Sequence, residues 1–148
     1  MKQIWQVLFI VLLIAFAAEC TNNRVEGSMQ EVTYSLRTNF DEYTNDELNA
    51  SLFHNIIDCF SPDIWDFMVL APDKPISGST FIQVGAPEEI VDFKFTLEIG
   101  FENLKSGLKI YRLYTDDKSM VLQCFIDYWQ EQRIPDISLW EDVSEEMK

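Results

Sequence analysis

The chain has 148 residues, of which 47% are hydrophobic and 14% aromatic. This size and apolar content suit a single folded domain with its own core and exclude a chain that is disordered throughout. The formal net charge is -14, from 11 Lys and Arg against 25 Asp and Glu. Such a charge argues against binding nucleic acid, whose phosphates attract clustered Lys and Arg, and against docking on an anionic membrane surface. It favours a basic partner, or serves solubility alone.

The amino terminus has the pattern of an export signal. Lys2 is followed by the apolar run VLFIVLLIAFAA at residues 7–18 and then by a polar stretch. A short basic start and an apolar run of this length are typical of a secretory signal peptide. The run is shorter than the roughly 20 apolar residues of a membrane-spanning helix. We expect residues 1–20 to be a leader and 21–28 a polar linker, and any membrane contact to involve this segment alone.

Three amino termini compete for the mature protein. Ala15-Phe16-Ala17 offers an A-x-A site for an ordinary signal peptidase. Cys20, followed by the polar stretch TNNRVEGS, resembles the lipidated cysteine of bacterial lipoproteins. This resemblance covers residues 1–20 and departs from the family pattern at Glu19, where a small residue is usual. A start at Met29 is the third choice. We predict an exported or membrane-anchored protein, and a cytoplasmic one if translation begins at Met29.

Two elements are expected before residue 62. Residues 31–37, EVTYSLR, alternate between apolar and polar and predict a half-buried strand. Residues 44–60 carry apolar side chains at helical spacing, with a capping box of Thr44 and Glu47 at the start. Asn49 falls near the middle of the apolar face of this helix. The match of Asn49-Ala50-Ser51 to a glycosylation acceptor is therefore interpreted as chance.

Four further strands and a second helix follow. Strands are predicted at residues 64–70, 79–85, 91–101 and 108–114, the third being the most regular alternation in the chain. Gly100 lies within that strand and is a candidate for a β-bulge. A helix is expected to begin near Thr115 or Asp116 and to run past Trp129, ending before Pro135.

The order strand, helix, four strands, helix predicts an α+β domain over residues 29–134. We expect a two-layer sandwich, in which an antiparallel meander of about five strands carries both helices on one face. A curved half-barrel sheet is the alternative. Residues 135–148 form an acidic tail, in which Trp140 is expected to pack on the domain before the chain frays.

Few residues suggest chemistry. His54 is the only histidine, and the helical count places it on the polar side of the first helix. No phosphate-binding loop, dinucleotide-binding turn, calcium loop or zinc-ligand spacing is present. We therefore predict a protein that is not an enzyme and has no cofactor. Cys59 and Cys124 form a disulfide only if the domain folds in an oxidising compartment, and otherwise stay reduced.

The aromatic residues exceed what strand alternation assigns to one core. Aromatic side chains flanked by acids suit an interface with a basic protein, although they also serve to fill a core. We predict a non-enzymatic interaction module of the inhibitor, immunity or chaperone type that binds a basic partner protein. The alternative is an exported or lipid-anchored envelope protein that binds a small ligand on its sheet face. The predicted partner-binding residues are Trp65, Tyr111, Tyr114, Trp140, Glu141 and Asp142.

Overall fold

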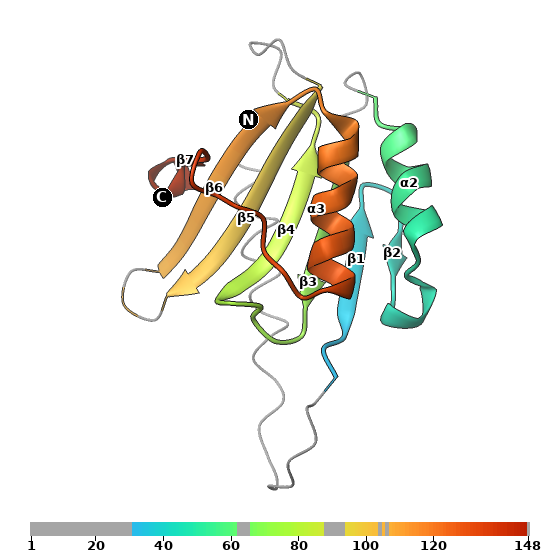
Figure 1. The fold of residues 1–148 in the computed structure, drawn as a ribbon, viewed down its shortest axis with the longest axis horizontal. Helices are drawn as coiled ribbons and strands as arrows, with labels where there is room; N and C mark the ends of the chain where they lie inside the picture. Colours follow the sequence, from blue (N-terminus) through green and yellow to red (C-terminus); the bar gives the residue numbers. More distant parts are fainter. Residues whose placement is uncertain (1–30, 62–65, 88–93, 104, 106, 148) are drawn as a thin grey trace, which may run out of the picture. The chain divides into compact units, whose positions relative to one another are not determined.

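The structure is a computed structural model that describes residues 31–61, 66–87, 94–103, 105 and 107–147. Its main feature is a seven-stranded antiparallel sheet in the order β2-β1-β3-β4-β5-β6-β7 (Figure 1). The described part of the chain also contains two α-helices. The prediction of an α+β fold with an antiparallel sheet and helices is therefore confirmed. In the part of the chain that is described, no helix is long and apolar enough to cross a membrane.

The sheet contains the predicted strands and two that the sequence does not predict, so the expected count of five is wrong. The additional strands are β2 (Glu42–Tyr43) and β7 (Glu141–Asp142), which form the two edges of the sheet. A strand of two residues is too short to show an alternating pattern. The strands that correspond to predicted ones are β1 (Tyr34–Thr38), β3 (Phe67–Pro72), β4 (Ser79–Gly85), β5 (Phe95–Asn103) and β6 (Gly107–Thr115).

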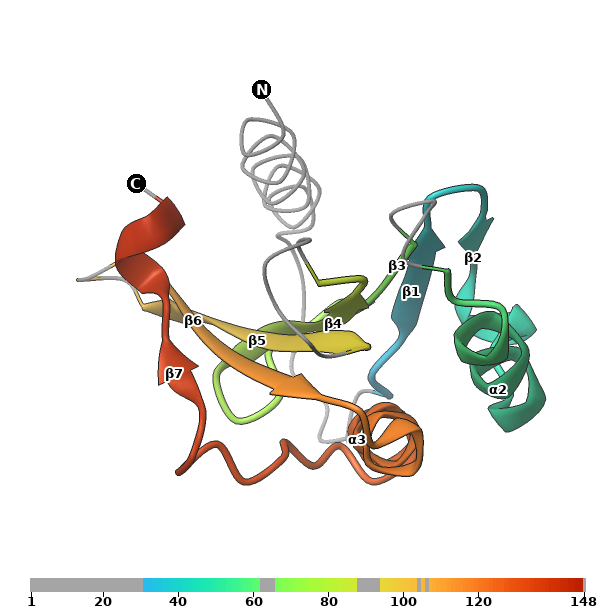
Figure 2. The same ribbon diagram turned by 90° about the horizontal axis from the view of Figure 1, so that it is seen from above.

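One face of the sheet and both helices share a single apolar core. The cross-strand pairs Leu36↔Leu70, Leu70↔Ile82 and Ile82↔Ile99 place fully buried side chains in a row across β1, β3, β4 and β5. Figure 2 shows α3 lying against this face. The helices, α2 (Ala50–Asp58) and α3 (Lys118–Gln130), add the buried side chains Phe53, Ile57, Val121, Leu122, Phe125 and Tyr128.

The two helices run antiparallel and contact each other. The ring centroid of Phe53 lies 6.2 Å from that of Phe125 and 5.5 Å from that of Trp129. Further along α2, the Asp58 carboxylate lies 2.5 Å from the Lys118 ammonium, at the start of α3. This ion pair is half-exposed and therefore contributes little stability. The aromatic contacts, which bury large apolar surfaces, hold the helix pair together.

The first helix begins later than the sequence predicts. Thr44 and Glu47 do interact, and the Glu47 carboxylate accepts the Thr44 amide N–H at 2.7 Å, but this cap belongs to a separate 3-10 helix, η2 (Asn45–Glu47). Leu48 follows with an extended backbone, φ -71° and ψ 132°. Its side chain is only 7% exposed, so burying Leu48 in the core interrupts the helical path.

Asn49 is the N-cap of α2 and does not lie on its apolar face, so that prediction is wrong. Its side-chain oxygen accepts the Leu52 amide N–H at 3.0 Å. The residue is exposed and has an extended backbone. An asparagine before a helix satisfies an amide that otherwise lacks a partner, and this local hydrogen bond fixes the start of α2.

A β-bulge in β4 sends Ser79 and Phe81 to opposite faces of the sheet. Ser79 pairs with Phe101, and Phe81 pairs with Gly100, so β4 advances two residues while β5 advances one. Residues two apart in a regular strand share a face, and the extra residue of a bulge breaks this rule. The irregularity lies in β4, opposite the glycine at which the sequence suggests it.

Ser79 faces the core and joins a chain of buried hydroxyl groups. Its Oγ lies 2.9 Å from the Tyr128 hydroxyl and donates to the Phe81 carbonyl at 3.2 Å. The Tyr34 hydroxyl donates to the Tyr128 carbonyl at 3.0 Å. These bonds connect β1, β4 and α3 across the core. Burial, with a smaller effect of the Asp73 carboxylate, raises the pKa of Tyr34 to about 12.

Phe81 lies on the other face, directly over Gly100. A Cβ atom at Gly100 would lie 2.1 Å from Cε1 of Phe81, which is far inside van der Waals contact. Phe81 is only 4% exposed, so its ring has little room to move away. Position 100 therefore needs glycine because the ring occupies the space that a side chain would fill.

We predict that Gly100→Ala lowers the free energy of unfolding by about 1–3 kcal/mol, the usual cost of overpacking. Urea denaturation monitored by circular dichroism measures the change. Gly85→Ala is the matched control, since the nearest atom to its added methyl is 3.8 Å away. Equal stability of the two variants would contradict the contact between Phe81 and Gly100.

We predict that Tyr34 makes the fold sensitive to alkali. Its pKa is raised from 10.0 to about 12 in the folded protein. The folded state therefore favours the neutral phenol, and this stabilisation is complete below pH 10 and is lost as the pH rises to 12. Tyr34→Phe cannot ionise, so its free energy of unfolding should fall less steeply than that of the wild type over this range. Urea denaturation at several alkaline pH values measures the free energy of unfolding of both proteins. If this free energy falls equally steeply with pH in Tyr34→Phe and in the wild type, the prediction is refuted.

Candidate interaction surface

After α3 the chain crosses the sheet and closes around its β6 edge. Gln132 has a φ of 49°, a left-handed conformation that ends the helix. The following segment runs along the α3 side of the sheet to β7, which pairs with β6 (Figures 1 and 2). The 3-10 helix η4 (Ser144–Met147) comes next. We call residues 134–147 the C-terminal clasp.

The C-terminal clasp contacts both faces of the sheet. On the helix side, Ile134, Ile137 and Trp140 are partly buried against the core. On the opposite side, Val143 is 2% exposed, and its amide N–H donates to the Ile110 carbonyl at 2.9 Å. The chain thus keeps packing beyond Trp140, where the sequence analysis expects it to fray, because Val143 finds an apolar site around the sheet edge.

A tight turn in the clasp presents one leucine to solvent. The Trp140 amide N–H donates to the Ile137 carbonyl at 3.0 Å and closes a β-turn in which Leu139 is the third residue. The Ser138 amide donates to the Asp136 carboxylate at 3.0 Å. The first and last residues of the turn pack on the core, whereas Leu139 is 90% exposed. We call residues 136–140 the leucine turn.

Acidic side chains flank the leucine turn, and residues 134–147 contain no Lys or Arg. Asp136, Glu141 and Asp142 are exposed. Hydrogen bonds from Ser138 hold the pKa of Asp136 below its usual value, and those from Ser144, together with a weaker effect of Lys109, do the same for Asp142. Both carboxylates are therefore ionised at neutral pH, and the clasp presents negative charge around an apolar side chain.

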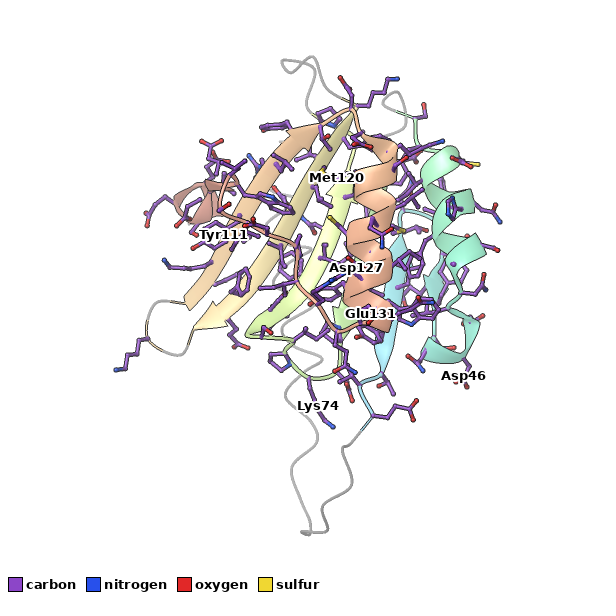
Figure 3. All side chains as sticks on the ribbon, in the orientation of Figure 1. Asp46, Lys74, Tyr111, Met120, Asp127 and Glu131 are labelled. Carbon is purple, nitrogen blue, oxygen red and sulfur yellow. The ribbon has the colours of Figure 1, made fainter. Side chains whose placement is uncertain are left out.

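The structure places five of the six predicted partner-binding residues on β6 or in the clasp beside it, divided between the two faces of the sheet. Tyr114 is on β6 as well, but it lies on the opposite face from Tyr111 because side chains alternate along a strand. Trp65 lies outside the described residues. Trp140 packs on the helix side, where Asp142 pairs with Tyr111 (Figure 3), whereas Glu141 pairs with Arg112 and shares the face of Tyr114.

Leu139, the exposed apolar residue of this surface, is not among the residues predicted from the sequence. The sequence favours aromatic anchors, but Tyr111 and Trp140 are half-buried. The centroid of the Tyr111 ring lies 5.8 Å from that of the Phe101 ring. The available signal was the pattern Asp136-Ile137-Ser138, because Asp and Ser stabilise turns through side-chain bonds to nearby backbone. A turn there places Leu139 at its apex and turns Trp140 inward.

A row of polar side chains crosses the face of the sheet that lies opposite the helices. The register pairs Gln83 with Glu98 and Glu98 with Arg112 across β4, β5 and β6. The Arg112 Nε donates to Glu98 at 2.6 Å, Gln83 donates to the other Glu98 oxygen, and an Arg112 terminal nitrogen lies 2.9 Å from the Glu146 carboxylate in η4. Arg112 thus connects the sheet to the clasp.

This row is an ion-pair network centred on Arg112. Burial by itself would lower the pKa of Arg112, but the Glu98 carboxylate, aided by Tyr114 and Glu146, raises it above its usual value. A guanidinium held in this way keeps its proton and serves as a fixed charge. The arrangement can therefore position the clasp.

The remaining sequence candidates lie elsewhere. His54 is exposed on α2, as the helical count indicates. Within the described ranges, no group of three or more His, Cys, Asp or Glu side chains is placed to hold a metal ion. Cys20 and the whole leader lie outside the described residues, so export and lipidation stay predictions.

Cys59 and Cys124 are free thiols in the structure. Cys59 caps the end of α2 next to Asp58, which meets Lys118 at the start of α3. Cys124 lies six residues further along α3, about 9 Å along the helix axis. The disulfide expected for an oxidising compartment therefore stays a prediction. Burial, with a smaller effect of Asp127, raises the pKa of Cys124 to about 11, which makes its thiol unreactive.

Comparison with known proteins gives no family assignment. No protein-family model matches the chain. Comparisons with curated proteins and with solved structures likewise find no match.

We predict that Arg112→Met is strongly destabilising, because it leaves the mostly buried Glu98 carboxylate without its cation. The expected loss in the free energy of unfolding is about 3–5 kcal/mol, the usual cost of breaking a buried pair. Glu146→Gln removes only the exposed partner and should cost less than about 1 kcal/mol. Chemical denaturation of both variants tests this order, and a double variant, Glu98→Leu with Arg112→Leu, should recover much of the loss. Equal costs for the two single variants would contradict the assignment of Glu98 as the main partner of Arg112.

Proposed function

We propose that this protein is a non-enzymatic interaction module that binds a basic partner protein through the β6 edge and the C-terminal clasp. The observation that carries the proposal is the exposed Leu139, held in a fixed turn between the exposed acidic residues Asp136 and Glu141. Interfaces of moderate size combine an apolar anchor with a polar rim, and this surface has both parts.

The charge of the chain supports the sign of the proposed partner. The net charge is -14, and the clasp carries five of the carboxylates without a Lys or Arg of its own; two of them, Asp142 and Glu146, pair with cations of β6. Several cations elsewhere are already matched, since Arg37, Lys118 and Arg133 each form an ion pair with a carboxylate. The surplus negative charge would steer a basic protein toward the clasp and repel acidic ones.

The proposal is tested by salt-dependent capture from the native host, followed by titration with the purified partner. We expect a partner of net positive charge whose affinity falls as salt rises. Glu141→Gln should weaken association several-fold, mainly by slowing the on-rate, because a rim charge acts through steering. Asp46→Asn removes the same charge at η2, away from Tyr111 and the β6 edge (Figure 3), and should behave as the wild type.

Retention of no basic protein at low salt would refute the proposal, as would equal effects of Glu141→Gln and Asp46→Asn.

A second candidate, an exported protein that binds a small ligand on the sheet face, is favoured by one observation. The buried Thr96 hydroxyl has no hydrogen-bond partner and lies on the same face as Glu98 and Arg112. A small molecule that copurifies, binds independently of salt and is lost in Thr96→Val would support that candidate instead.

A further inference from the structure

We infer that the leucine turn is the recognition element of this surface, and that it inserts Leu139 into an apolar pocket rimmed by Lys or Arg on the partner. This inference rests on the proposed function and names the chemistry of the site. It assigns the main contact to a single aliphatic side chain, and gives the aromatic residues Tyr111 and Trp140 a supporting role.

The fold holds Leu139 in place before a partner arrives. Ile137 and Trp140, the two ends of the turn, are packed against the core, and a 3.0 Å hydrogen bond closes the turn between them. The Ser138 amide bond to Asp136 fixes the approach to the turn. An anchor that is already ordered loses little conformational entropy on binding, which increases the affinity of a given contact.

The surroundings of Leu139 define the pocket that would receive it. Asp136 lies on one side in the sequence, and Glu141 and Asp142 lie on the other, all of them exposed. Hydrogen bonds keep the pKa of Asp136 and Asp142 low, so these charges persist well below neutral pH. A complementary surface therefore has an apolar centre of leucine size with cations around it. An acidic partner, or a second copy of this chain, would meet like charges there.

Phe40 provides a natural comparison. It is the other large apolar side chain of the described residues that is strongly exposed, at 73%. Its turn joins β1 to β2, and its neighbours Asn39 and Asp41 are exposed instead of packed on the core. The nearby Glu42 carboxylate is paired with Arg37, which offsets its charge. Phe40 thus shares exposure with Leu139, but hydrogen bonds hold its turn, such as that from the Thr38 amide to the Asp41 carbonyl at 2.8 Å, and its ends are not packed on the core.

The test uses a phage-displayed library of random peptides selected against the full chain. We expect the enriched peptides to combine Lys or Arg with apolar residues. Synthetic copies of these peptides should bind Leu139→Ser about 10- to 100-fold more weakly than the wild type in fluorescence polarisation, as burial of a leucine side chain implies. Phe40→Ser should stay within about fivefold of the wild type, since contacts outside the anchor are nearly neutral. Leu139 is exposed, so Leu139→Ser should fold normally, which a thermal melt verifies.

The outcomes separate this inference from the proposed function. Basic peptides that bind Leu139→Ser as well as the wild type would overturn the role of the leucine turn and leave the acidic surface in place. Enriched peptides without Lys or Arg, or no enrichment at all, would overturn both. Equal losses in Leu139→Ser and Phe40→Ser would also overturn the inference, because they would show a general effect of exposed apolar residues.

Discussion

The ion pair between Arg112 and Glu98 is the contact on which the arrangement of the clasp depends. Both side chains are mostly buried on the sheet face opposite the helices, where an unpaired charge is costly. The pair is consistent with the register of β5 against β6, in which Glu98 lies opposite Arg112. It also leaves a terminal guanidinium nitrogen for Glu146, so that η4 has a defined place beside the sheet. Without this cation η4 would lose its charged contact with β6, and the 3.9 Å pair of Lys109 with Asp142 would remain.

The clasp in turn determines the surface that we assign to binding. Trp140 packs on the helix side of the sheet and Val143 on the other side, so the chain between them is stretched around the edge. The same packing that buries Trp140 forces the preceding turn outward and exposes Leu139. Stability and recognition are therefore coupled here, because the residues that hold the turn in place are part of the core and the residue at its apex is free to meet a partner.

Edge strands are usually sites of unwanted association, and this sheet has very short ones. β2 and β7 have two residues each, and β7 consists of the acids Glu141 and Asp142. Charged side chains on a short edge strand discourage pairing with another copy of the same chain. The same charges attract a basic protein, so one feature serves both to prevent self-association and to select a partner.

The sequence by itself determined the main strands, the two helices and the antiparallel α+β class, because these elements carry long apolar patterns of period 2 or 3.6. It also placed His54 on an exposed helix surface and gathered most of the aromatic and acidic residues of the candidate surface. The tertiary structure alone decided the rest. Leu48 interrupts the first helix because the core buries it, and β2 and β7 exist only through pairing with a neighbour. Leu139 is exposed because Ile137 and Trp140 are anchored, and no local pattern records an anchor supplied by distant strands.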